Sequence, residues 1–66
     1  MDAFKVRLIN EQFELQEKLE KLKSFTLSEN FSKVAPEQQE LLKEQLRHMV
    51  EYNRVLIKRL NLLGVA

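Results

Sequence analysis

The sequence lacks most of the residues that stabilise small proteins covalently or through metals. Its 66 residues include no cysteine, no tryptophan, one glycine, one proline and one histidine. Without cysteine there is no disulfide framework and no thiolate zinc site, and one histidine is too few for a histidine metal site. A chain this short rarely buries enough apolar surface alone. We therefore expect one domain over residues 1–66, without metal or cofactor, that homo-oligomerisation stabilises.

An excess of charge of one sign is absent as well. The chain has 11 Lys and Arg against 10 Asp and Glu, which gives a net charge of +1. A general nucleic-acid binder carries a basic stripe, so a small DNA-binding regulator is disfavoured and no DNA partner is expected. A small anionic ligand needs only a few well-placed cations, and this balance does not exclude one.

Long hydrophobic runs are also missing. No apolar run approaches the ~20 residues of a membrane span, and the N-terminus has no apolar core of a signal peptide. We expect a soluble, intracellular protein that has no membrane partner.

The chain is organised around a predicted helix over residues 36–63. Pro36 fits the first helical position, where a missing N–H costs nothing, and Gly64 is a candidate C-cap. An apolar seam between them alternates steps of three and four residues, the spacing by which one helix packs along another. The seam consists of Gln39, Leu42, Leu46, Met49, Asn53, Leu56, Leu60 and Leu63. Asn53 is expected to fix register or oligomeric state.

A second stripe lies about 100° around the same helix. It consists of Leu41, His48, Tyr52, Val55 and Leu62, with Gln45 and Arg59 in the same line. A helix in a lone hairpin needs one apolar stripe. Two stripes therefore indicate a partner on each side of this helix.

Residues 3–24 form the other predicted helix. They contain no Gly or Pro and are rich in good helix formers, and Asp2 is a candidate N-cap. The predicted seam is Phe4, Leu8, Glu11, Leu15, Lys18, Leu22 and Phe25, widened by Leu19, with a second stripe at Val6, Ile9 and Phe13. Lys18 in this seam either extends to solvent or pairs with an acid, or it faces a pocket between subunits and meets an anion.

The segment between the helices breaks this pattern. Thr26 and Glu29 have the spacing of a capping box, and Ser28 is an alternative N-cap. Phe31 and Val34 are expected to close the end of the hairpin around a short helical turn at about 27–33. The predicted fold is all-α, a hairpin of two long antiparallel helices whose seams face each other and whose other stripes pack on neighbouring copies.

The sequence gives little support to catalysis. There is no cysteine nucleophile, and the serines lie near the turn with no histidine nearby in sequence. His48 on an amphipathic helix is typical of an interface or surface residue. Carboxylates beside lysines at helical spacing, such as Glu14 with Lys18, are ordinary surface pairs. We expect no catalytic residue and no enzyme activity.

Aromatic and cationic residues allow two interpretations. Tyr52 fits a packed interface ring with its hydroxyl at the rim, and Phe4 fits a core position. A ring beside a cation also suits a flat base and its phosphate. Arg7 lies three residues after Phe4, and Arg59 seven after Tyr52. Composition and spacing do not decide between these interpretations.

The arrangement of residues as a whole resembles a known family. The pattern comprises Phe4-x-x-Arg7-Leu8-x-x-Glu11-x-x-Glu14-Leu15-x-x-Lys18-Leu19-x-x-Leu22, then Phe25, Phe31, Gln39-Glu40-x-Leu42-x-x-Gln45 and Met49-x-x-Tyr52-x-x-Val55-Leu56-x-x-Arg59-Leu60. Over residues 4–60 it resembles the anti-CBASS cyclic-nucleotide sponges, small helical proteins of tailed phages. The resemblance implies a compact homohexamer in the host bacterial cytoplasm. It would bind cyclic di- and trinucleotides without cleaving them and so block CBASS immunity.

The resemblance also implies roles for individual residues. Lys18 would contact phosphate, as a lysine of the first helix does in the family. Phe4 falls at or next to the family's base-stacking tyrosine; it keeps the stacking face and loses the hydroxyl. Arg59 is the nearest match to a basic residue implicated in trinucleotide binding. With Arg7 and Tyr52 these form the predicted ligand site. The alternative is a helical oligomer that binds or inhibits a host protein through an exposed stripe.

Overall fold

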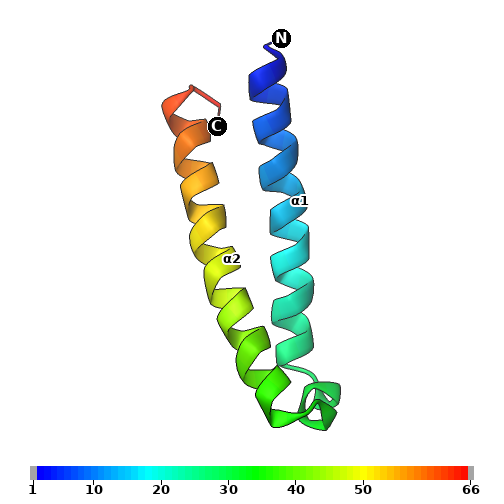
Figure 1. Cartoon of the computed structure of the whole chain (residues 1–66). Coiled ribbons are helices and arrows are strands. Elements are labelled where there is room, and N and C mark those ends of the chain that lie inside the picture. The colour runs from blue at the N-terminus through cyan, green and yellow to red at the C-terminus, as the bar shows by residue number, and fades with distance from the viewer. Residues whose placement is uncertain (1, 66) are drawn as a thin grey trace.

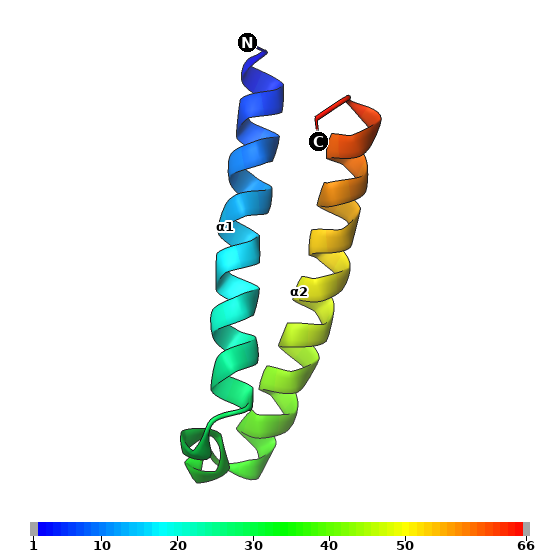
Figure 2. The same ribbon diagram turned by 180° about the vertical axis from the view of Figure 1, so that it is seen from behind.

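The structure is a computed structural model that describes residues 2–65. In chain order it has helix α1 (Ala3–Thr26), the 3₁₀ helix η1 (Glu29–Lys33) and helix α2 (Pro36–Leu62). The long helices run antiparallel, side by side, with η1 at the closed end and both ends of the chain at the open end (Figures 1 and 2). The predicted all-α hairpin is therefore confirmed.

Two helix starts follow the local chemistry expected from the sequence. The Asp2 carboxylate accepts the backbone N–H of Phe4 at 3.0 Å, which caps the start of α1. Pro36 is the first residue of α2. α1 continues to Thr26, two residues beyond the predicted end, and α2 ends at Leu62, one residue before it.

Gly64 ends α2 in a Schellman motif. Its φ of +79° is in the left-handed region that favours glycine. The Gly64 N–H donates to the carbonyl of Asn61 at 3.1 Å, and the Val65 N–H donates to that of Leu60 at 2.9 Å. Val65 also packs on the core to which Leu60 belongs. This turn folds the end of the chain back over the open end of the hairpin.

The core is a row of leucines between the two helices. It consists of Leu8, Leu15 and Leu19 from α1 with Leu56 and Leu60 from α2. Leu56 is completely buried, and Leu46 and Met49 pack against the row from the same face of α2. The predicted seam of α2 is therefore its buried face, except that Leu63 is 36% exposed.

The predicted seam of α1 is wrong at Lys18 and Phe4. Lys18 is exposed, and Leu19 occupies the buried position instead. Both residues have heptad spacing between Leu15 and Leu22, so the pattern alone does not choose between them. Burial of a leucine is favourable and burial of an unpaired lysine is not. Lys18 makes no ion pair within residues 2–65, so the predicted Glu14–Lys18 pair is also absent there.

A polar layer interrupts the leucine row at Asn53, which is 7% exposed. The Asn53 amide donates to Gln16 Oε1 at 2.7 Å and accepts from Gln12 Nε2 at 3.1 Å. Gln16 in turn donates to Glu20 at 2.8 Å. A shifted register would separate these partners and leave buried polar groups unpaired, which is the physical reason to expect that Asn53 fixes the register.

The predicted capping box at the closed end does not form. Thr26 is the last residue of α1, and its hydroxyl donates to the carbonyl of Lys23 at 2.7 Å. Ser28 precedes η1 without a side-chain capping bond, and its hydroxyl donates to the carbonyl of Phe25 at 2.7 Å. The final turn of a helix has unpaired carbonyls. Both hydroxyls bond to carbonyls of this turn, and the Phe25 carbonyl also accepts the Ser28 N–H at 3.0 Å. Neither hydroxyl caps an N–H group of η1.

Phe31 closes the hairpin as predicted. It is 6% exposed and contacts Phe25 edge-on, with ring centroids 5.8 Å apart and planes at 87°. The Lys43 ammonium lies 6.0 Å from the Phe31 ring centroid. The Gln39 side-chain amide donates to the carbonyl of Val34 at 2.7 Å, which fixes the entry into α2.

The second stripe of α2 is exposed in the single chain. The predicted stripe of α1 is exposed at Phe13, whereas Val6 and Ile9 are half-buried and Ile9 packs against the leucine core. Leu41, Tyr52, Val55 and Leu62 on α2 and Phe13 on α1 are each at least 43% exposed. None of the helices in residues 2–65 combines the length and apolar character that crossing a bilayer requires.

Candidate functional site

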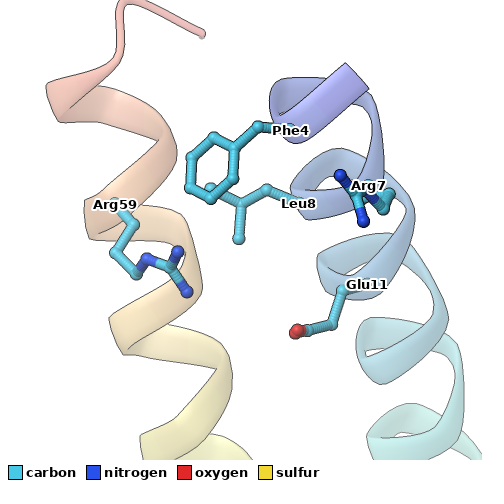
Figure 3. Close-up of a pocket in the computed structure, with 5 residues that line it drawn as sticks. All are labelled: Phe4, Arg7, Leu8, Glu11 and Arg59. Carbon is cyan, nitrogen blue, oxygen red and sulfur yellow. The ribbon is translucent and has the colours of Figure 1, made fainter. Parts of the chain in front are cut away.

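A cleft lies near the open end of the hairpin, between the first turns of α1 and the last turns of α2. Its volume is about 270 Å³, and it is lined by Phe4, Arg7, Leu8, Glu11 and Arg59 (Figure 3). The antiparallel course of the helices brings Arg59 opposite α1, although 55 positions separate it from Phe4 in the numbering. Buried Leu8 joins the cleft to the leucine core.

The cleft has an accessible aromatic face. Phe4 is 48% exposed, so its interpretation as a core residue is wrong. The guanidinium carbon of Arg59 lies 5.8 Å from the centroid of the Phe4 ring, a cation–π distance. The neighbour of the Phe4 ring on α2 is therefore a cation. An apolar side chain at that position would bury the ring. Phe4 and Arg59 together present a flat surface beside a positive charge.

Glu11 is the acidic group of the cleft and is half-buried. Its Oε2 accepts a hydrogen bond from the Tyr52 hydroxyl at 2.9 Å, which joins α1 to α2 at the edge of the cleft. The charges of Arg7, Arg59 and Glu11 together give the cleft lining a net charge of one positive unit. The bond to Glu11 is the main reason why the pKa of Tyr52 is raised, because a tyrosinate there would lose this donor and face a carboxylate.

Four of the five predicted ligand residues meet in this region. Phe4, Arg7 and Arg59 line the cleft, and Tyr52 is tied to it through Glu11. Lys18 is not part of it, because 11 residues of helix place it about 16 Å along the axis from Arg7. Within one chain, a ligand in the cleft is therefore bound without Lys18.

Sequence reasoning missed Glu11 and Leu8 as cleft residues. Leu8 follows Phe4 by four residues and Glu11 follows it by seven, so the helical spacing places all three on one face and could have identified them. Leu8 and Glu11 belong to the predicted seam of the first helix and not to the predicted ligand site. His48 is exposed, with its imidazole 3.7 Å from the Glu44 carboxylate on the outer surface. Residues 2–65 hold no group of three or more His, Cys, Asp or Glu placed to bind a metal.

The fold and the cleft define a small helical-hairpin protein with an open, partly aromatic cleft between its helices. The cleft offers one aromatic face, two guanidinium groups and one carboxylate, which suit a flat, anionic ligand with hydrogen-bond donors. A family model described as Sequestin matches residues 2–62. Since the match covers nearly the whole chain, this protein belongs to the Sequestin family. No curated protein and no solved structure matches the chain. The family name fits the sequestering activity expected from the resemblance.

Proposed function

We propose that this protein binds a nucleotide second messenger and holds it intact, and that the messenger is a cyclic di- or trinucleotide. The observation that carries the proposal is the Phe4 ring with Arg59 5.8 Å from its centroid, in a cleft that also holds Arg7. The Sequestin match supports sequestration, and the resemblance to phage sponges supports the ligand class. In this proposal the protein removes the signal of a CBASS system in the host bacterial cytoplasm.

The proposed binding mode uses the cleft residues in distinct ways. A base stacks on Phe4, an interaction of about 1–3 kcal/mol per base. Arg59 then leaves the ring and, with Arg7, forms charge-assisted hydrogen bonds to phosphate. A single cleft of about 270 Å³ is near the lower end of ligand-site volumes. It suits one nucleotide unit, so two chains would share a cyclic dinucleotide.

Sharing a ligand requires a homo-oligomer, and the exposed second stripe of α2 supplies a surface for it. The hexamer is the form that the resemblance implies. In such an assembly Lys18 contacts phosphate from another chain, since it lies about 16 Å from Arg7 along its own helix. The family-derived role of Lys18 therefore depends on assembly.

The test is calorimetric titration with cyclic GMP-AMP, a linear dinucleotide and a cyclic trinucleotide. We expect tight binding of the cyclic forms, at fewer than one ligand per chain, and recovery of the ligand uncleaved by chromatography. Phe4→Ala and Arg59→Ala should weaken binding at least about tenfold, the loss of one stacking or charged contact. The controls Leu27→Ala and Arg54→Ala change exposed residues outside the cleft lining and outside the second stripes. Absence of heat with every cyclic ligand contradicts the proposal.

The second candidate function is an interaction module that binds a host protein. The exposed apolar stripe of Leu41, Tyr52, Val55 and Leu62 favours it. Thermal unfolding separates the two functions. A ligand that binds only the folded form raises the melting temperature, so micromolar cyclic nucleotide stabilises a sponge and leaves an interaction module unchanged.

A further inference from the structure

Glu11 is an unusual group to find in a cleft for phosphate. A carboxylate repels phosphate and accepts hydrogen bonds only. Glu11 nevertheless lines the same cleft as the two arginines, and Figure 3 shows its carboxylate directed toward the space between α1 and α2. Its presence therefore favours a ligand that also carries an N–H donor.

The Glu11 carboxylate retains unused acceptor capacity. Tyr52 donates to Oε2 alone, at 2.9 Å. Glu11 takes part in none of the ion pairs among residues 2–65, although Arg7 is four positions before it on the same helix. The Tyr52 bond thus orients the carboxylate across the cleft while Oε1 stays available to a ligand.

The position of Glu11 relative to Phe4 suits contact with the edge of a stacked base. Seven residues of helix, about 10 Å along the axis, separate their backbone positions, and both side chains line the same cleft. A base on the Phe4 ring extends its edge toward Glu11, while the phosphate stays with the arginines. The edge groups of nucleic-acid bases that donate outward are chiefly exocyclic amino groups.

We propose that Glu11 accepts a hydrogen bond from an exocyclic amino group of the bound base and so makes the cleft selective for amino-bearing bases. This inference rests on the proposed function and specifies the base within it. A base without the amino group leaves a half-buried acceptor unpaired, which weakens binding. Because Glu11 remains partly exposed to water, we expect discrimination of about tenfold.

The experiment compares ligands that differ only in the amino group. The pairs are cyclic di-AMP with its analogue containing unsubstituted purine, and cyclic di-GMP with its analogue containing hypoxanthine. Dissociation constants are measured for the unmodified protein, Glu11→Gln and the control Glu14→Gln, whose residue is exposed on α1 outside the cleft lining. Circular dichroism checks that each variant keeps its helix content.

In the pair whose parent ligand binds more tightly, loss of the amino group should weaken binding to the unmodified protein about tenfold or more. Glu11→Gln should lower this ratio, because the neutral carboxamide oxygen forms a weaker hydrogen bond to the amino group than the carboxylate does. Glu14→Gln should retain the full ratio. The inference is overturned if the unmodified protein binds both members equally or if Glu11→Gln leaves the ratio unchanged. Absence of binding to all four ligands and to cyclic trinucleotides overturns the proposed function, and this inference with it.

Discussion

Tyr52 reports on the cleft at the scale of a single residue. The chain has one tyrosine and no tryptophan, so the near-ultraviolet absorbance of tyrosinate belongs to Tyr52 alone. Its pKa is raised above 10.0, the ordinary value for tyrosine, mainly by the hydrogen bond to Glu11. We expect spectrophotometric titration to give a pKa above 10.0 and Glu11→Gln to lower it toward that value. An unchanged pKa in Glu11→Gln would contradict the hydrogen bond.

The same bond predicts how stability depends on pH. The Tyr52 pKa is higher in the folded than in the unfolded chain, so the folded state retains the tyrosine proton more strongly. The contribution of this bond is fully present below pH 10 and is lost as pH rises through the raised pKa. Tyr52→Phe has no group that ionises at this position, so its free energy of unfolding should fall less as pH rises above 10. Urea denaturation of both proteins at a series of pH values around and above 10 measures the difference.

Asn53 allows a prediction about the polar layer. Asn53→Ala removes the partner of both Gln12 and Gln16 at a position that is 7% exposed. We expect the free energy of unfolding to fall by about 1–3 kcal/mol, the cost of unpaired buried polar groups. Urea denaturation at one fixed protein concentration measures it. Asn10→Ala, at an exposed position of α1, is the control and should change stability by less than about 0.5 kcal/mol.

Residue-scale features were the hardest to predict from the sequence. Lys18 and Leu19 both fit the heptad spacing, and only the packed hairpin shows that Leu19 is buried. Phe4 has an apolar side chain typical of a core residue, yet it is half-exposed. Its neighbour on α2 is the guanidinium of Arg59 and not an apolar side chain. The Tyr52–Glu11 bond joins residues 41 positions apart. Such contacts depend on the rotation of each helix about its axis, which spacing alone leaves open.

At the scale of elements, the stability of the closed end is predicted to depend on Phe31. Phe31→Ala removes a buried ring and its edge-on contact with Phe25, so we expect a loss of about 3–5 kcal/mol. Leu27→Ala is the matched control in the same connection, because Leu27 is 80% exposed. The melting temperatures of the two variants are compared by thermal unfolding, monitored by circular dichroism. Equal melting temperatures for the two variants would show that η1 does not stabilise the hairpin.

The elements themselves were largely predictable because local chemistry determines their ends. Asp2, Pro36 and Gly64 act at helix ends through their own caps or backbone preferences, and all three take the predicted positions. The capping box failed because α1 continues through Thr26, whose hydroxyl donates to the carbonyl of Lys23 within that helix. Sequence spacing does not reveal that α1 extends this far.

At the scale of the whole molecule, one hairpin leaves much apolar surface uncovered. Its core is five buried leucines, while the stripe of Leu41, Tyr52, Val55 and Leu62 is exposed. Domains of this length have a total stability of roughly 3–10 kcal/mol. A thin core therefore gains considerably from covering the stripe with a second copy. This physical argument and the proposed sharing of a cyclic ligand both require self-association of the chain.

Two valines on α2 provide a matched test of that assembly. Val55 lies in the stripe and is 43% exposed, while Val50 is 47% exposed and lies about 140° around the helix from it. Aspartate at either position has the same cost in helix propensity. We expect Val55→Asp to dissociate the oligomer in sedimentation velocity and to weaken binding of a shared cyclic dinucleotide, and Val50→Asp to change neither. A monomeric unmodified protein at all concentrations tested, or an oligomer that both variants retain, would show that the stripe does not mediate self-association. The stripe would then be left as the surface for a different protein.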